Sequence, residues 1–249
     1  MSRIRVGGAA AVLAAAPLAF LPGGLFPFTL PKITLVFLGV VLAATVPPGG
    51  RLPRALAWLT GAALGWSALV AALHGAGVAE FAGRYPRYEG ALALGAAAGA
   101  FWAGARLLGV DGSGTAPARL VFARTTALGT VAVACLSIVE ATGARPVAGA
   151  ADERVGSLLG NATYQGVYAA VAGLVLIPHA VSAYRRGASA DAALFALAGP
   201  AAVIAIALSG SRAALLGIAA GAALALAAFT LRYEVALEPG ALSMTLEVI

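Results

Sequence analysis

The chain has 249 residues, of which 61% are hydrophobic and only 10% are charged. A soluble globular domain carries about 25% charged residues, so this composition excludes an ordinary soluble enzyme and indicates an integral membrane protein. The net charge of +6 does not indicate nucleic-acid binding, because membrane proteins concentrate Lys and Arg in cytoplasmic loops. With Cys135 as its single cysteine, the chain offers neither a disulfide nor a cysteine-rich metal site.

Eight apolar stretches follow one another, each near the length that a helix needs to cross about 30 Å of hydrocarbon. They cover about residues 6–21, 28–46, 55–73, 91–108, 120–139, 162–183, 192–208 and 213–231. We therefore predict an all-α integral membrane protein with a bundle of about eight transmembrane helices. Residues 1–231 form a single transmembrane domain in this prediction, and residues 232–249 form a short tail that resembles a truncated or frame-shifted end.

The first stretch also resembles a signal peptide, because Arg3 and Arg5 precede it and Ala14-Ala15-Ala16 is a possible cleavage site. Cleavage there would leave a short apolar region, so an uncleaved first span is the favoured interpretation. Small residues four positions apart, such as Gly61 and Gly65, favour close helix packing, although they are common by chance in a chain with 32 glycines.

The distribution of basic residues sets the expected orientation. Alternate loops place ten of the 16 Lys and Arg residues on one side and six on the other. The side with ten is predicted to be cytoplasmic, with both termini inside, which fits a multi-pass protein of the bacterial inner membrane. The exported side still holds more basic residues than orientation requires, and anion binding at that face would explain them.

Three groups of polar residues lie on the predicted exported side. The first is Arg84 and Arg87 with Glu89. The second begins at Arg154 and runs into the sixth stretch, where Asn161 is a good helix N-cap. The helical spacing of Asn161, Tyr164, Gln165 and Tyr168 predicts a polar stripe that faces a cavity or another helix. Hydrogen bonding between helices is the simpler interpretation of that stripe.

The third group is Ser209, Ser211 and Arg212, between the last two apolar stretches. Either serine can cap the helix that follows, and the free amides of a helix N-terminus together with an arginine favour phosphate. The alternative is an arginine that only helps to set orientation.

His74 is a weak candidate for a catalytic base, and His179 lies near the other membrane face. No metal-ligand spacing, nucleophile elbow or phosphate-binding loop occurs, so neither a metal nor a cofactor is expected.

These motifs resemble those of the bacterial O-antigen ligase and O-antigen polymerase-like membrane glycosyltransferases. Residues 84–90 resemble the family's Gly-x-x-x-Arg-Tyr-x-Gly segment, residues 154–168 its Arg-x-Gly-Thr-x-Gly-Asn-Pro-Asn stretch, and residues 208–217 its Thr-x-Ser-Arg-Gly-Ala segment. Their order and spacing match over about residues 83–231. Ala162 and Thr163 depart from the pattern by replacing the family's Pro and second Asn.

The resemblance implies transfer of a glycan from an undecaprenyl-pyrophosphate carrier to an acceptor at the outer face of the inner membrane. The acceptor would be the lipid A core, another glycan or a protein. Arg154 and Arg212 would hold the pyrophosphate, with Arg84, Arg87, Asn161, Gln165 and Ser211 as further donor-binding residues. Such proteins continue into further spans and an exported loop with a histidine that activates the acceptor. The donor-binding half is therefore expected here, whereas the half that carries the general base is not.

Two other functions remain open. A transporter or flippase for an anionic lipid-linked substrate would need functional charges at both membrane faces, whereas the candidates here concentrate on the exported side. A non-catalytic fragment that assembles with a partner is the third possibility. Membrane lipid is a partner under all three hypotheses.

Overall fold

The computed structural model describes residues 2–22, 28–73, 77, 90–109, 116–147 and 155–237. This part of the chain contains helices and no strand, which confirms the predicted all-α class. The helices are α1 (Ser2–Ala15), α2 (Thr29–Ala44), α3 (Arg54–Leu73), α5 (Ala91–Leu108), α6 (Ala116–Ala141), α7 (Ala162–Arg185), α8 (Ser189–Ser209) and α9 (Arg212–Leu237). Two short 3₁₀ helices, η1 (Ala16–Leu18) and η2 (Ser157–Leu159), precede α2 and α7.

Five of these helices, α3, α5, α6, α7 and α8, are long and apolar enough to cross a membrane. Three shorter apolar segments, at residues 4–18, 29–44 and 212–223, accompany them. The described chain is therefore compatible with a multi-pass membrane protein. The expected number of eight spans and the cytoplasmic location of both termini stay predictions.

Some helix ends differ from the expected spans for identifiable reasons. α1 gives way to η1 at Pro17, because a proline lacks the amide hydrogen and its ring clashes with the carbonyl four residues earlier. α6 continues through Glu140, which the sequence assigned to a polar loop. α9 continues to Leu237, so the first residues of the expected tail are helical.

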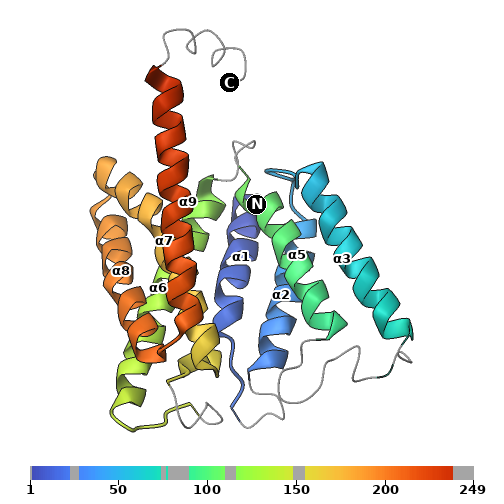
Figure 1. Ribbon diagram of the computed structural model, residues 1–249, viewed down its shortest axis with the longest axis horizontal. Helices are drawn as coiled ribbons and strands as arrows, with labels where there is room; N and C mark the ends of the chain where they lie inside the picture. Colours follow the sequence, from blue (N-terminus) through green and yellow to red (C-terminus); the bar gives the residue numbers. More distant parts are fainter. Residues whose placement is uncertain are drawn as a thin grey trace.

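Successive helices run in alternating directions along the bundle (Figure 1). α7 packs against α8, α9 and α6, and α8 also packs against α6. α1 bridges this group to α2 and α5, whereas α3 packs on α5 at the edge. The chain thus forms a group of α6, α7 and α8, beside which α1, α2 and α5 form a second buried cluster, with α3 at the edge.

Small side chains fill the contacts between the central helices. Ala169 and Ala170 on α7 meet Ala201, Ala202 and Ala205 on α8 in one buried cluster. Small residues let helix backbones approach closely in a membrane, where apolar surface alone gives no preference for protein over lipid. By contrast, α3 buries no residue.

Candidate functional site

The sequence-predicted site residues that the structure describes lie at one end of the bundle, which we call the polar end. α2, α7 and α9 begin there, and α6 and α8 end there (Figure 1). Leu73 and Ala91, the helix residues that flank the first arginine group, also lie at helix ends on this side. Because successive helices alternate in direction, successive loops lie at alternate ends of the bundle.

Lys32 on the first turns of α2 ties this helix to the segment before α7. Its ammonium group donates hydrogen bonds to the carbonyl oxygens of Leu158 and Leu159, at 3.2 Å each. The same nitrogen lies 5.2 Å from the centroid of the Phe28 ring. In the sequence, Lys32 is one of the six basic residues assigned to the predicted exported side, and it bears there only on orientation. The signal was nevertheless available, because a lysine within an apolar helix usually has a specific partner.

Glu140 holds the turn at residues 156 and 157, which belongs to the second group of polar residues. Its side chain is buried, and its Oε2 accepts hydrogen bonds from the backbone amides of Gly156 at 3.1 Å and Ser157 at 2.9 Å. Ser157 adopts a φ of +46°, a left-handed conformation that non-glycine residues rarely hold without support. Oε1 has no hydrogen-bond partner among the described residues. The carboxylate therefore anchors a strained turn two residues after position 154.

The polar stripe on α7 divides between solvent and neighbouring helices. Asn161 is exposed and caps α7, because its side-chain oxygen accepts a hydrogen bond from the Thr163 amide at 2.8 Å. Gln165 is fully buried, and its Nε2 donates to the Ala205 carbonyl on α8 at 2.9 Å. The Tyr168 hydroxyl donates to the Thr126 carbonyl on α6 at 3.4 Å. Gln165 and Tyr168 thus make the hydrogen bonds between helices that the simpler interpretation predicted.

The segment between α8 and α9 forms a compact, capped turn. Gly210 takes a left-handed φ of +59°, which suits the residue that ends a helix. The Ser209 hydroxyl accepts a hydrogen bond from the Ser211 amide at 3.2 Å, and the Ser211 hydroxyl accepts one from the Ala214 amide at 3.3 Å. Ser211 therefore caps α9, and Arg212 begins this helix with an exposed side chain.

Gly166 brings this turn against α7. A Cβ atom at position 166 would lie 2.6 Å from the Ser211 Cβ, 2.8 Å from the Ser209 Oγ and 2.9 Å from the Ala214 Cβ. Only glycine therefore permits this approach of α9 to α7. The contact places the capped start of α9 next to the buried Gln165 turn of α7.

This arrangement is chemically suited to bind an anion. The exposed guanidinium of Arg212 lies at the N-terminus of α9, which is the positive end of the helix dipole. The N-termini of α7 and α2 lie at the same end of the bundle. Within the described residues, no group of three His, Cys, Asp or Glu side chains could hold a metal ion. His179 lies in the second half of α7, with its Nδ1 3.0 Å from the Val175 carbonyl and its ring edge against Phe195.

Four candidate residues, Arg84, Arg87, Arg154 and His74, lie outside the described residues. Their expected convergence with Arg212 therefore stays a prediction. Among the described candidates, Ser211 is held against α7 at Gly166, Gln165 bonds α8, and Asn161 and Arg212 are exposed at the polar end.

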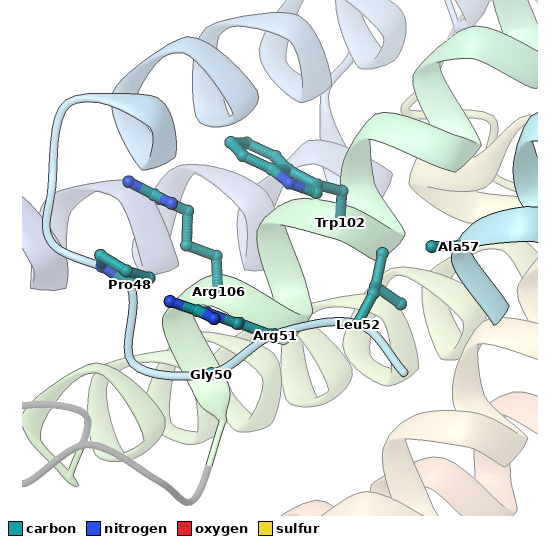
Figure 2. Close-up of a pocket in the computed structure, with 7 residues that line it drawn as sticks. All are labelled: Pro48, Gly50, Arg51, Leu52, Ala57, Trp102 and Arg106. Atoms are coloured by element: carbon teal, nitrogen blue, oxygen red, sulfur yellow. The ribbon is translucent and has the colours of Figure 1, made fainter. Parts of the chain in front are cut away.

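A basic pocket of about 400 Å³ lies at the opposite end of the bundle. The loop of residues 47–53 and the last turns of α5 form its walls, and Figure 2 shows Arg51 and Arg106 extending from these two elements beside Pro48. The Arg106 Nε donates to the Ala43 carbonyl at 2.8 Å, and its Nη2 donates to the Val46 carbonyl at 2.7 Å. Its guanidinium carbon lies 5.3 Å from the centroid of the Trp102 ring.

Arg51 and Arg106 are two of the ten basic residues on the predicted cytoplasmic side, and the sequence did not predict this pocket. No local pattern links the two residues, because the pocket depends on how the loop folds back onto α5. Comparisons of the chain with family models, curated proteins and solved structures found no match.

Proposed function

We propose that the chain binds an undecaprenyl-pyrophosphate-linked glycan at the polar end and takes part in transfer of this glycan at the outer face of the bacterial inner membrane. The observation that carries the proposal is the exposed Arg212 at the first residue of a helix that Ser211 caps. An arginine next to free helix amides is a favourable partner for a phosphate group. The motif resemblance to O-antigen ligases adds the identity of the donor.

The proposed role of Arg212 is electrostatic. A pyrophosphate leaves a glycan as an anion, so a positive group held in place beside it stabilises the charge that develops in the transition state. Arg84, Arg87 and Arg154 are proposed to complete the site, and Lys32 and Glu140 hold the elements around it. Lys32 is a positioning residue in this scheme, since its ammonium is engaged by two backbone carbonyls.

We expect the chain by itself to transfer the glycan slowly or not at all. Deprotonation of the acceptor hydroxyl by a positioned base contributes about 10²–10⁴-fold to such reactions. Among the described residues, Glu140 is a buried acidic side chain at the polar end, and its Oε2 accepts both amides of the turn at residues 156 and 157, so we assign it a positioning role. His74 remains the residue to mutate first if the purified chain transfers glycan robustly.

Donor binding is the decisive measurement. The purified chain is titrated with a labelled undecaprenyl-pyrophosphate glycan, and Arg212→Ala should weaken binding by roughly 10- to 100-fold, because a charge-assisted hydrogen bond contributes about 1.5–3 kcal/mol. Arg212→Lys should restore binding only in part, since lysine lacks the planar fork that grips phosphate with two parallel bonds. Arg186→Ala, an exposed arginine at the end of α7, is the matched control and should bind as the wild type does.

Wild-type protein that does not bind the donor, or binding that is indifferent to Arg212, would remove this function. A parallel assay with lipid A core acceptor separates binding from transfer. Sidedness is tested by thiol labelling of Asn161→Cys and Arg51→Cys in a Cys135→Ala background, where only the cysteine at position 161 should react from outside intact cells.

A transporter or flippase for the same lipid-linked substrate is the second candidate. The basic pocket with Arg51 and Arg106 favours it, because alternating access requires binding groups at both faces. Vesicles that contain the purified chain distinguish the two functions. A flippase moves labelled donor between leaflets without acceptor, whereas a transferase leaves the donor in its leaflet.

A further inference from the structure

The pocket between residues 47–53 and the end of α5 has the features of a phosphate-binding site. We propose that it binds the phosphate group of an anionic phospholipid, with Arg51 and Arg106 as the groups that contact it. The inference does not depend on the donor site, which lies at the other end of the bundle.

The charge of the pocket favours an anion. Of the described residues that line it, two are arginines and none is acidic. A guanidinium has five N–H donors, and Arg106 uses Nε and Nη2 for backbone carbonyls. Neutral carbonyls engage these donors but do not cancel the charge, and the other Arg106 donors make no hydrogen bond within the described part of the chain. Arg51 is exposed and adds a second positive group, which extends from the loop of residues 47–53.

The pocket is held in shape by close backbone contacts. The Gly49 amide donates to the Arg106 carbonyl at 2.7 Å. A Cβ atom on Gly50 would lie 2.7 Å from the Ala105 carbonyl oxygen and 2.7 Å from the Gly109 Cα. The loop that carries Arg51 is therefore anchored to the helix that carries Arg106, and this fixes the spacing of the two charges before a ligand binds. A site formed in advance loses less entropy on binding.

The position along α5 favours a lipid as the source of the phosphate. Trp102 and Arg106 lie in the last two turns of a helix long and apolar enough to cross a membrane. Tryptophan and arginine at such positions lie at the level of the lipid headgroups, and basic residues there attract anionic lipids. The volume of about 400 Å³ lies within the range of small-molecule sites and can hold a phosphate with part of its headgroup.

Trp102 provides a local probe, because it lines the pocket and is one of three tryptophans. The full chain with Trp58→Phe and Trp66→Phe is placed in nanodiscs of phosphatidylcholine that contain a minor fraction of brominated lipid, which quenches nearby tryptophan. Brominated phosphatidylglycerol should quench Trp102 more strongly than brominated phosphatidylcholine. Arg51→Gln in the same background should reduce this preference roughly fivefold, the contribution of one basic residue near an anionic surface.

Arg185→Gln is the control, because Arg185 is an exposed arginine that ends α7 on the same side of the bundle. It should retain the full preference for phosphatidylglycerol. Inorganic phosphate added in increasing amounts identifies the source of the ligand: displacement of the brominated lipid shows that the pocket also takes free phosphate, and no displacement shows a site for the lipid alone. Both results support a phosphate site.

The proposal is overturned if, in the Trp58→Phe, Trp66→Phe protein with both arginines intact, the two brominated lipids quench Trp102 equally and inorganic phosphate does not change its fluorescence. It is also overturned if Arg51→Gln and Arg185→Gln reduce the preference to the same extent, because the preference would then reflect general surface charge. The comparison of the two brominated lipids uses the protein with both arginines intact. An effect of Arg51→Gln on folding therefore does not conceal a negative result.

Discussion

Helices α3 and α8 are both long and apolar enough to cross a membrane, yet their environments are opposite. α3 buries none of its residues and exposes Trp58, Leu59 and Trp66. α8 buries a stripe of mainly small residues that faces α6 and α7 and includes Ala198, Ala202 and Ala205. Apolarity therefore does not distinguish the interior from the surface of this molecule. Side-chain size and the availability of polar partners do, as expected where lipid is as apolar as the core.

The largest effect should come from closing the approach of α9 to α7. Gly166→Leu places side-chain atoms where three atoms of residues 209, 211 and 214 already lie within 3 Å of the new Cβ. Overpacking costs about 3 kcal/mol in such cases, so the melting temperature of the purified protein should fall by roughly 5–10 °C.

Gly61→Leu on α3 is the matched control, because a Cβ there meets no atom within 4 Å. Its melting curve should coincide with that of the wild type. Equal destabilisation by the two variants would contradict the contrast between the central helices and α3.

The second effect concerns the buried carboxylate of α6. Glu140→Ala removes the acceptor of the Gly156 and Ser157 amides and leaves both without that partner. A buried donor without a partner costs about 1–3 kcal/mol, so we expect a loss of about 2 kcal/mol and faster hydrogen exchange at these two amides. Glu140→Gln retains an acceptor oxygen and should lose less. Unchanged exchange in Glu140→Ala would show that the turn does not depend on this side chain.

A smaller effect is expected for the polar contact between α7 and α8. Gln165→Leu removes the hydrogen bond to the Ala205 carbonyl, but it also removes an Oε1 that has no described partner. Hydrogen bonds between membrane helices contribute about 0.6 kcal/mol on average, so the free energy of unfolding should change by less than about 1 kcal/mol. A loss as large as that of Glu140→Ala would mean that this glutamine, rather than small-residue packing, holds α7 to α8.

The smallest effect should come from the ion pair between α6 and α8. Arg124 donates to Asp191 through Nε at 2.7 Å and Nη2 at 3.0 Å, but the arginine is exposed. Exposed pairs are screened by salt and contribute little. Asp191→Asn should therefore leave the melting temperature at physiological salt unchanged within error, with a decrease visible only at low salt. A clear decrease at high salt would show that the pair is part of the core.

Much of the helical arrangement could be predicted from the sequence. The span predicted over residues 91–108 coincides with α5, and those over 55–73 and 192–208 differ from α3 and α8 by three residues or fewer at either end. Such accuracy has a simple cause: a segment in hydrocarbon must satisfy its own backbone hydrogen bonds, so a long apolar run between charged or Pro- and Gly-rich segments has to be a helix. Asn161 as the N-cap of α7 was also correct, because capping depends on neighbours in sequence.

By itself, then, the sequence determined the helical class, the positions of the long apolar helices and the local caps, all of which depend on residues close together in the chain. Tertiary structure alone decided which faces are buried, since a helix that is apolar all round carries no signal of its neighbours. It also decided that Lys32 would bond η2, that Glu140 would hold the turn at Ser157, and that Arg51 would share a pocket with Arg106. Each of these contacts joins residues far apart in sequence, and a polar group within an apolar bundle takes whichever partner the folded chain brings to it.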